Sequence, residues 1–327
     1  MSNVFVTRMI PGPGISMLKE KGYDVTVYPK DQIIPRKELL KKVKGADAIL
    51  SLLTDRIDAE LLDAAGKQLK IVGNYAVGFD NIDLAAAKKR GVLVTNTPGP
   101  EITESVAEHT FALMIALARR ICEADQFTRA GKYHGWSPTM LLGTDLHGKT
   151  LGIVGLGRIG FAVAERAVKG FRMKALYHDP NRNEDFEKQY GGEYRDLPEL
   201  LRESDVVTLH VPLLPATRHL ISKKQLALMK PTAFLINTAR GPIIDEKALL
   251  EALYKKKIAG AGIDVFECEP STDCDPTDHM ELKKLSNTVL TPHNASASIE
   301  ARGAMARTAA ENIIAAMEGR TPPNVAK

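Results

Sequence analysis

The chain has 327 residues, of which 44% are hydrophobic and 26% charged, and this predicts a globular protein long enough for two domains with buried cores. Its formal net charge of +4 is modest and its basic residues are scattered, so we expect no nucleic-acid partner. The longest apolar run, 111–118, is too short to span a membrane, and Cys122, Cys268 and Cys274 lack metal or redox spacing, which favours free thiols, a cytoplasmic location and no bound metal.

Short apolar runs alternate with helical stretches along the first hundred residues. The runs, which suit buried parallel strands, span 4–7, 23–28, 47–52, 69–73 and 92–95. The helical stretches between them span 15–21, 36–44, 59–65 and 84–90. This alternation predicts a parallel sheet with helices on both faces.

A second series of the same kind follows a break at Asn96-Thr-Pro-Gly-Pro100. A long helix is predicted from 103 to 130, and it carries the chain out of the first domain. Further strands are predicted at 150–154, 173–178, 205–210, 233–237, 261–265 and 288–291, with helices at 158–169, 197–203, 223–229 and 246–254. The last helix, 297–318, follows the second sheet, so it is free to return to the first domain.

A glycine-rich turn, Gly155-Leu-Gly-Arg-Ile-Gly160, lies between a predicted strand and a predicted helix. In such a turn Gly155 allows the tight bend, Gly157 lets the backbone approach a phosphate, and Gly160 lets the helix pack on the strand. The helix start adds unpaired N–H groups and a partial positive charge. Asp179 ends the next strand about 20 residues later, where an acidic residue binds the ribose hydroxyls of NAD. We therefore expect NADH as the cofactor, with NADPH as a weaker alternative because Arg182 is near.

Three polar side chains follow predicted strands of the second series: Arg240, Glu269 and His293. Hydride transfer to a keto acid needs a cation for the carboxylate and a proton donor, which a bidentate Arg and a His can supply. A carboxylate beside His293 would favour its protonated form. Because open α/β sheets bind ligands beyond the carboxyl ends of their strands, we interpret the three as a catalytic set. Singly, each could also be a solvated Arg, a structural His or part of an acidic turn.

Several longer motifs occur in one order over nearly the whole chain. They are Asn74-Tyr-Ala-Val-Gly-Phe-Asp-Asn-Ile-Asp83, Val94-Thr-Asn-Thr-Pro98, Val106-Ala-Glu-His-Thr110, Gly152-Ile-Val-Gly-Leu-Gly-Arg-Ile-Gly160, Asn237-Thr-Ala-Arg-Gly241 and Thr291-Pro-His293. Through them the chain resembles the D-isomer-specific 2-hydroxyacid dehydrogenases, and most of all their glyoxylate/hydroxypyruvate reductase branch.

The resemblance implies NAD(H)-dependent reduction of a small 2-keto acid, glyoxylate or hydroxypyruvate, to the D-2-hydroxy acid. Arg240 would bind and polarise the substrate, His293 would be the acid/base, and Glu269 would pair with His293. The loop Ala76-Val77-Gly78 would hold the substrate carboxylate through backbone N–H groups. The residues that match cofactor-contacting positions are Thr110, Gly155, Gly157, Arg158, Ile159, Gly160, Asp179, His210, Pro212, Thr238, Ala239, Asp264, His293 and Ala295.

The resemblance also implies an α/β architecture of two Rossmann-like or flavodoxin-like domains with parallel sheets and a cleft between them. Residues 1–100 and 297–327 would form a discontinuous substrate-binding domain, and residues 101–296 an NAD-binding domain. A homodimer is implied as well. Trp136, the only tryptophan, could enter the partner subunit's site, or it could simply anchor its own loop.

Some features separate this chain from related activities. After His293 it has Asn294 and Ala295, where the family commonly has Ile-Gly, so contacts to the nicotinamide carboxamide stay open. A phosphite dehydrogenase would have a lysine at Val77, and a formate dehydrogenase a glutamine at Glu269. A non-catalytic NAD-sensing corepressor built on this fold would carry terminal extensions. We therefore favour the reductase, with the phosphite dehydrogenase-like and corepressor-like functions as alternatives.

Overall fold

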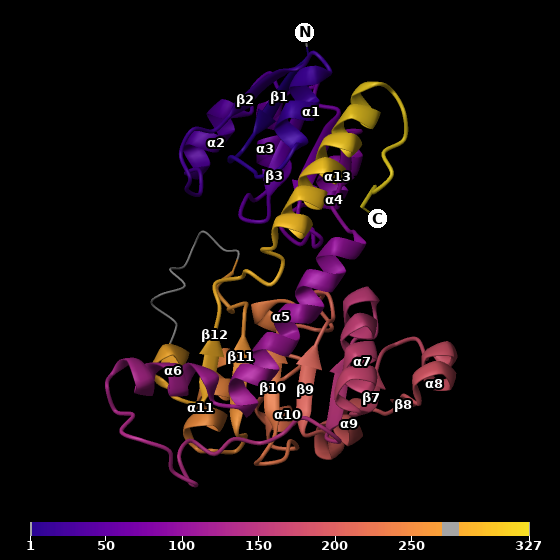
Figure 1. Cartoon of the computed structure of the whole chain (residues 1–327). Helices are drawn as coiled ribbons and strands as arrows, with labels where there is room; N and C mark the ends of the chain where they lie inside the picture. Colours follow the sequence, from indigo (N-terminus) through magenta and orange to yellow (C-terminus); the bar gives the residue numbers. More distant parts are fainter. Residues whose placement is uncertain (1, 270–280, 327) are drawn as a thin grey trace. The chain divides into compact units, whose positions relative to one another are not determined.

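Two compact units make up residues 2–269 and 281–326, the part of the chain that the computed structural model describes (Figure 1). The first unit contains residues 2–102 and 297–326, and the second contains residues 103–269 and 281–296. Each unit is built around one parallel β-sheet. The predicted α/β class with two parallel sheets is therefore confirmed.

The first unit has a five-stranded sheet. Its strands are β1 (Asn3–Val6), β2 (Asp24–Val27), β3 (Ala48–Leu52), β4 (Ile71–Tyr75) and β5 (Leu93–Thr95), and its helices are α1 (Gly14–Glu20), α2 (Arg36–Lys42), α3 (Ala59–Ala65), α4 (Leu84–Lys89) and α13 (Ile299–Met317). The strand order is β2-β1-β3-β4-β5, all parallel. Asp58 and Asp83 begin α3 and α4, because each carboxylate accepts a backbone N–H of the first turn.

Helix α13, far from the other elements of this unit in sequence, completes the first unit. It packs against α1 (Figure 1) and against β4. The face that it buries is rich in alanine. The Tyr75 hydroxyl, at the end of β4, donates a hydrogen bond to the backbone oxygen of Arg302 at 2.8 Å. Ser298 begins the helix by accepting the backbone N–H of Ala301. The core of this unit therefore needs two segments that are widely separated along the chain.

The second unit has a seven-stranded sheet. Its strands are β6 (Thr150–Val154), β7 (Lys174–His178), β8 (Glu193–Tyr194), β9 (Val206–Leu209), β10 (Phe234–Asn237), β11 (Gly260–Ile263) and β12 (Thr288–Leu290). The described helices are α5 (Pro100–Ala118), α6 (Ile121–Arg129), α7 (Arg158–Phe171), α8 (Glu184–Tyr190), α9 (Leu197–Glu203), α10 (Lys223–Leu226) and α11 (Glu246–Tyr254), with 3-10 turns η1 (Gly241–Ile243) and η2 (Glu281–Lys284). The strand order is β12-β11-β10-β9-β6-β7-β8. From β6 the chain adds β7 and β8 on one side and then β9 to β12 on the other, so the order of addition changes sides at β6, where the glycine-rich turn begins.

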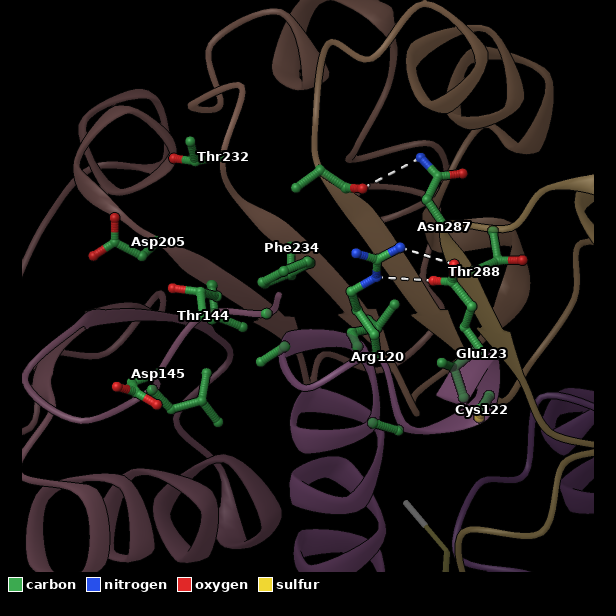
Figure 2. Close-up of a pocket in the computed structure, with 18 of the residues that line it drawn as sticks. Arg120, Cys122, Glu123, Thr144, Asp145, Asp205, Thr232, Phe234, Asn287 and Thr288 are labelled. Carbon is green, nitrogen blue, oxygen red and sulfur yellow. Dashed lines mark hydrogen bonds and ion pairs between the residues drawn. The ribbon is translucent and has the colours of Figure 1, made fainter. Parts of the chain in front are cut away.

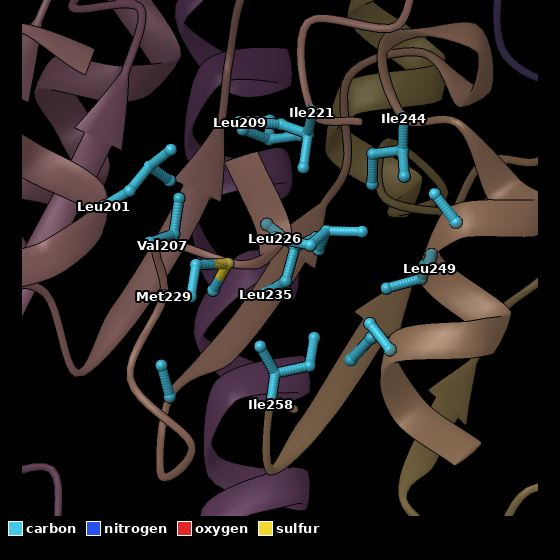
Figure 3. Packing of buried hydrophobic residues seen from close by; sticks show 14 of the residues in the cluster. Leu201, Val207, Leu209, Ile221, Leu226, Met229, Leu235, Ile244, Leu249 and Ile258 are labelled. Carbon is cyan, nitrogen blue, oxygen red and sulfur yellow. The ribbon is translucent and has the colours of Figure 1, made fainter. Parts of the chain in front are cut away.

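Apolar side chains cover both faces of the second sheet. Successive residues of a strand point to opposite faces, so Leu235 lies in one core and Ile236 in the other. The first core packs under α9, α10 and α11 and is drawn in Figure 3. The second contains residues of α5 and α7, such as Met114 and Val163. Since both faces are packed, the strand ends are held by a rigid framework.

The helix predicted from 103 to 130 is in fact two helices, α5 and α6. Arg120, between them, has a φ of 53°, a left-handed conformation that ends a right-handed helix. The backbone N–H of Thr144 donates to the Ala118 oxygen at 2.8 Å, so the returning chain satisfies one carbonyl at the helix end. The prediction also omitted α8 and β8, which are short.

The cysteines depart from expectation at one position. Cys122 is exposed with a free thiol, whereas Cys268 is disulfide-bonded rather than a free thiol. Cys274 lies outside the described residues. Sequence spacing could not reveal this, because a disulfide depends on the distance and direction of two Cβ atoms in the folded chain.

Helices α5 and α13 are each 19 residues long. Charged side chains interrupt both, including Glu104 and Glu108 in α5. Among the described helices, none is both long enough and apolar enough to cross a membrane.

One glycine of α7 is required by close packing, and this can be tested. A Cβ on Gly160 would overlap the backbone oxygen of Gly155, whereas a Cβ on Gly170 would meet no atom within 4 Å. We predict that Gly160→Ala lowers the free energy of unfolding by roughly 1–3 kcal/mol, the usual effect of overpacking. The same change at Gly170 should leave it equal or raise it by about 0.5–1 kcal/mol, because alanine favours helix. Urea unfolding of both variants and the parent measures the contrast, and equal stability of the two variants would contradict it.

Candidate active site

Arg240, Glu269 and His293 follow three neighbouring strands of the second sheet: β10, β11 and β12 respectively. These strands are parallel and adjacent, so their carboxyl ends meet at one edge of the sheet. The side chains selected from the sequence thus arise from the same edge, which we call the carboxyl edge.

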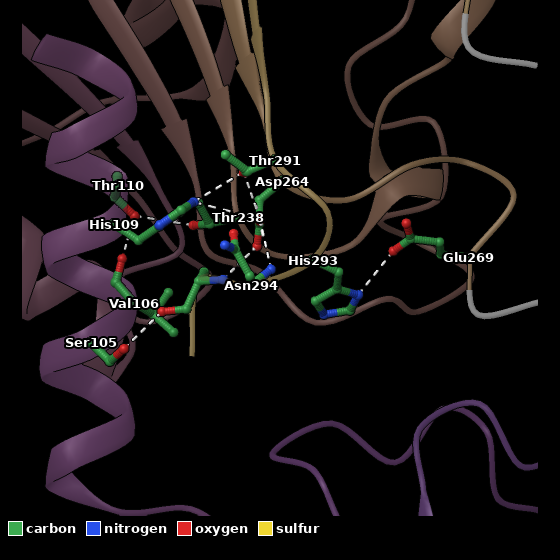
Figure 4. Close-up of polar contacts among 11 residues, drawn as sticks. Ser105, Val106, His109, Thr110, Thr238, Asp264, Glu269, Thr291, His293 and Asn294 are labelled. Atoms are coloured by element: carbon green, nitrogen blue, oxygen red, sulfur yellow. Dashed lines mark hydrogen bonds and ion pairs between the residues drawn. The ribbon is translucent and has the colours of Figure 1, made fainter. Parts of the chain in front are cut away.

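His293 and Glu269 form a direct pair at the carboxyl edge (Figure 4). The His293 Nδ1 lies 2.9 Å from a Glu269 carboxylate oxygen. A carboxylate can only accept, so Nδ1 carries the proton of this bond and Nε2 is left for another partner. The side chains are 24% and 18% exposed, so the pair is shielded from solvent without being sealed from it.

The loop that carries His293 is wrapped around the buried carboxylate of Asp264, which is 0% exposed. One oxygen accepts the Thr291 hydroxyl at 2.6 Å and the backbone N–H of Asn294 at 2.9 Å. The other accepts the backbone N–H of Ala295 at 2.9 Å. Burial alone would raise the pKa of the Asp264 carboxyl, but its hydrogen bonds outweigh burial and hold that pKa below its ordinary value.

Helix α5 contacts this loop through two side chains that the sequence analysis did not select. The His109 Nε2 lies 3.0 Å from the Thr291 hydroxyl and 3.5 Å from Asp264 (Figure 4). One turn earlier, the Ser105 hydroxyl donates to the backbone oxygen of Ala295 at 2.9 Å. The signal available in the sequence was the i, i+4 spacing of two polar residues on one helix face.

Thr110, selected as a cofactor contact, lies on the same helix beside a second selected residue. Its hydroxyl donates to the Val106 oxygen at 2.8 Å and lies 3.1 Å from the Thr238 hydroxyl. Because the Thr110 proton is already used, Thr238 is the donor between the two hydroxyls. Ala239, the next selected residue, is held by its N–H to the Asn237 side chain.

Arg240 lies in a tight loop between β10 and η1. The Asn237 side chain donates to the Arg240 backbone oxygen at 2.8 Å. The next residue, Gly241, packs so closely against the backbone of Phe266 that a Cβ would overlap its oxygen. Phe266 belongs to the segment that leads to Glu269, so the loops of Arg240 and Glu269 are packed against each other.

The glycine-rich turn joins β6 to α7 and fits a bound pyrophosphate. Gly155 has a φ of 95°, and a Cβ there would press on the backbone of His210. By contrast, no atom lies within 4 Å of a Cβ built on Gly157, so its backbone is open to a ligand. Arg158 and Ile159 begin α7 directly after it, where helix N–H groups are unpaired.

Asp179 connects this turn to the end of β7. Its carboxylate accepts the backbone N–H of Leu156 and that of Asn181, both at 2.9 Å. A carboxylate has about four acceptor positions, so it can still accept ribose hydroxyls. The residues of the turn therefore fit the dinucleotide expected from the sequence.

Arg182, three residues after Asp179, is committed to another acid. Its guanidinium donates two bonds of 2.8 Å to the two carboxylate oxygens of Glu187. The pair, with a further hydrogen bond from Tyr177, lowers the pKa of Glu187 to about 2. The guanidinium therefore faces α8 and is unavailable to a phosphate unless this bidentate pair breaks.

His210 and Pro212 follow β9, beside the glycine-rich turn. Burial lowers the pKa of His210 to about 3, so the imidazole is neutral at physiological pH. Its Nε2 lies 2.9 Å from the Thr208 hydroxyl. His210 therefore offers a neutral surface at this point rather than a cation.

The proposed substrate loop Ala76-Val77-Gly78 follows β4 in the first unit. Its carbonyls are turned inward: Val77 O accepts from the Asn96 side chain at 2.7 Å, and Ala76 O accepts from the Thr97 N–H at 2.9 Å. Trp136 lies in the loop after α6 and is 83% exposed. A role of this loop or of Trp136 in substrate binding stays a prediction.

A pocket of about 550 Å³ lies at the opposite, amino end of the second sheet (Figure 2). Its lining includes Arg120, Lys149, Asp205, Phe234 and Asn287. Arg120 pairs with Glu123, and Asp205 pairs with Lys230. None of the residues selected from the sequence as catalytic, substrate-binding or cofactor-binding lines it.

The match to known families falls on the second unit. Residues 111–295 match the model described as "D-isomer specific 2-hydroxyacid dehydrogenase, NAD binding domain". The matched region contains the glycine-rich turn, Asp179 and the carboxyl edge.

Individual relatives match along the whole chain. A glyoxylate reductase of Korarchaeum cryptofilum (strain OPF8) is 54% identical over 324 residues, which covers 98% of this chain and 95% of that protein. The crystal structure of TT0316 protein from Thermus thermophilus has a TM-score of 0.91 and 45% identity, covering 99% of this chain and 100% of that one. A glyoxylate reductase structure from Paecilomyes thermophila has a TM-score of 0.86 and 31% identity, covering 99% and 98%.

Proposed function

Because the chain belongs to the D-isomer-specific 2-hydroxyacid dehydrogenases and is an NAD-dependent dehydrogenase that reduces a keto acid, we propose that its substrate is glyoxylate or hydroxypyruvate. The product is the D-2-hydroxy acid. We propose a cytoplasmic location for the enzyme.

The observation that carries the proposal is the His293–Glu269 pair at the carboxyl edge. Nδ1 is held at 2.9 Å by the carboxylate, so the imidazole is oriented with Nε2 facing away from Glu269. The Glu269 carboxylate accepts the proton of Nδ1, so the proton on Nε2 is the one that His293 can offer to a substrate. Arg240 follows β10, which is separated from the strand before His293, β12, by β11 alone. Its guanidinium suits a substrate carboxylate or carbonyl.

The nicotinamide, when bound, supplies the hydride for the keto carbon. His293 gives the Nε2 proton to the carbonyl oxygen, which becomes the new hydroxyl. Arg240 holds the substrate and stabilises negative charge on that oxygen. We propose that the backbone N–H groups of Val77 and Gly78 bind the substrate carboxylate.

A substrate panel tests the proposal directly. We expect the parent to oxidise NADH with glyoxylate or hydroxypyruvate and to be inactive in NAD⁺ reduction with phosphite or formate. His293→Asn removes the acid/base but tolerates the left-handed backbone of this position, φ 53°. It should lower kcat by about 10²–10⁴ while NADH binding stays unchanged.

Two further variants sharpen this test. Glu269→Gln keeps an oxygen that can accept from Nδ1 but weakens that hydrogen bond by removing its charge, so kcat should fall by less than in His293→Asn. His147→Asn, at an exposed histidine, should match the parent. Parent-like turnover in His293→Asn would show that another group donates the proton.

We propose NADH rather than NADPH as the cofactor. The Asp179 carboxylate suits ribose hydroxyls and repels a 2′-phosphate. Arg182, the cation nearest to Asp179 in the sequence that could bind a 2′-phosphate, is instead paired with Glu187.

This pairing predicts a stepwise change of cofactor preference. Asp179→Asn should raise kcat/KM with NADPH by on the order of tenfold, because the repulsion of like charges is lost. Glu187→Gln releases Arg182, so the double variant should gain more than either single one. Glu184→Gln, at an exposed acid of the same helix, is the control. Equal kcat/KM with the two cofactors in the parent would refute the proposed preference.

We propose that the protein is a homodimer and that Trp136 reaches the partner's substrate site. The support is its exposure of 83%, which is unusual for the largest apolar side chain. An aromatic wall there would limit substrate length.

Trp136→Ala should then raise activity on phenylpyruvate relative to hydroxypyruvate by about tenfold, a difference typical of pocket fit. Trp136→Phe should keep most of the parent ranking. Sedimentation of each variant checks that it is still dimeric. A dimeric Trp136→Ala protein with the parent's substrate ranking would leave Trp136 as an anchor of its own loop.

A further inference from the structure

The catalytic loop 291–295 holds a conformation that its own residues do not favour. His293 has a φ of 53°, in the left-handed region that is unfavourable for a residue with a Cβ. Such a conformation persists only where surrounding contacts determine it. The contacts that do so here can be traced atom by atom.

The first of them come from Asp264, on both sides of His293. Before His293 in the chain, the Thr291 hydroxyl donates to the Asp264 carboxylate. After His293, the N–H groups of Asn294 and Ala295 donate to the same carboxylate. The His293 N–H itself donates to the Asp264 backbone oxygen at 2.8 Å. One residue thus fixes the whole loop, provided that its carboxylate stays in place.

The position of that carboxylate depends in turn on His109. The Thr291 hydroxyl has a single proton, and it is donated to Asp264 at 2.6 Å. The Thr291 oxygen, 3.0 Å from His109 Nε2, must therefore accept from the imidazole. The same Nε2–H faces Asp264 at 3.5 Å. Nε2 of His109 therefore carries a proton. It donates to the Thr291 hydroxyl and the Asp264 carboxylate, which are hydrogen-bonded to each other.

A second contact ties the loop to the same helix. Ser105 donates to the Ala295 oxygen at 2.9 Å, from one turn before His109 on α5. Helix α5 is packed by buried residues such as Met114 and Phe111, so its side chains start from a fixed backbone. The loop is therefore held on one side by β11, through Asp264, and on the other by α5.

We infer that His109 is a positioning residue of the reaction: by donating from Nε2 to Thr291 and Asp264, it holds the catalytic loop so that His293 faces the substrate carbonyl. His109 does not touch the substrate in this role. The inference rests on the proposed function for its catalytic consequence, and on the geometry alone for the fixing of the loop.

The test compares two replacements of His109. His109→Gln can place an amide N–H close to the position of the imidazole Nε2–H, whereas His109→Leu fills similar space without a donor. Glu108→Gln, at an exposed neighbour on α5, is the control. If His109→Leu does not fold, Thr291→Val breaks the same chain of hydrogen bonds at its next member and takes its place.

Activity gives the first readout. We expect His109→Leu to lower kcat by about 10- to 100-fold, because a misplaced proton donor slows the chemical step. The KM for the keto acid and the Kd for NADH should change by less than about twofold. His109→Gln should recover most of the loss. The double variant with His109→Leu and Thr291→Val should lose no more kcat than the more impaired single variant, since both changes break the same series of hydrogen bonds.

Hydrogen exchange gives a readout that needs no substrate. The N–H groups of 293–295 are bonded to Asp264, so His109→Leu should speed their exchange by about tenfold, and His109→Gln should not. Unchanged exchange and unchanged kcat in folded His109→Leu would overturn the inference, as would a loss of kcat that His109→Gln fails to recover. A parent inactive on every keto acid would instead overturn the proposed function and leave the exchange result to decide the role of His109 in the loop.

Discussion

A buried carboxylate is stable only when its oxygens are satisfied, and at the carboxyl edge this requirement shapes the surrounding chain. Asp264 lies at the end of β11 with no exposed surface, and its donors come from α5 and from the loop after β12. Meeting its hydrogen-bonding needs therefore brings three separate segments together. The left-handed backbone of His293 and the direction of its imidazole follow from that assembly.

Much of this arrangement could be predicted from the sequence, because the period of apolar residues and the strand-end positions of polar ones are local signals. The α/β class, the order of strands and helices, and the positions of Arg240, Glu269 and His293 after strands all came from such signals. The chemistry of these three side chains already suggested a carboxylate-binding cation, a proton donor and its acidic partner, and the resemblance implied the same roles. The His293–Glu269 contact itself is a feature of the folded chain.

What the sequence did not predict depends on long-range geometry. His109 and Thr291 are 182 positions apart, and no sequence pattern around either residue predicts contact with the other. The break at Arg120 depends on the chain returning to cap α5 at Ala118. The Arg182–Glu187 pair depends on how α8 begins. In each case the contact partner can be identified only from the folded structure.

The discontinuity of the first unit has a consequence for the order in which the protein can fold during synthesis. The last strand of the second sheet, β12, ends at Leu290, but the helix that covers β4 begins only at Ile299. Ile313 of α13 packs directly over Gly73 of β4. On the ribosome, the later-made unit can therefore finish its sheet first, while the earlier-made sheet waits with one face uncovered until α13 emerges. The sheet of the first unit is thus the part of the nascent chain most in need of protection from aggregation.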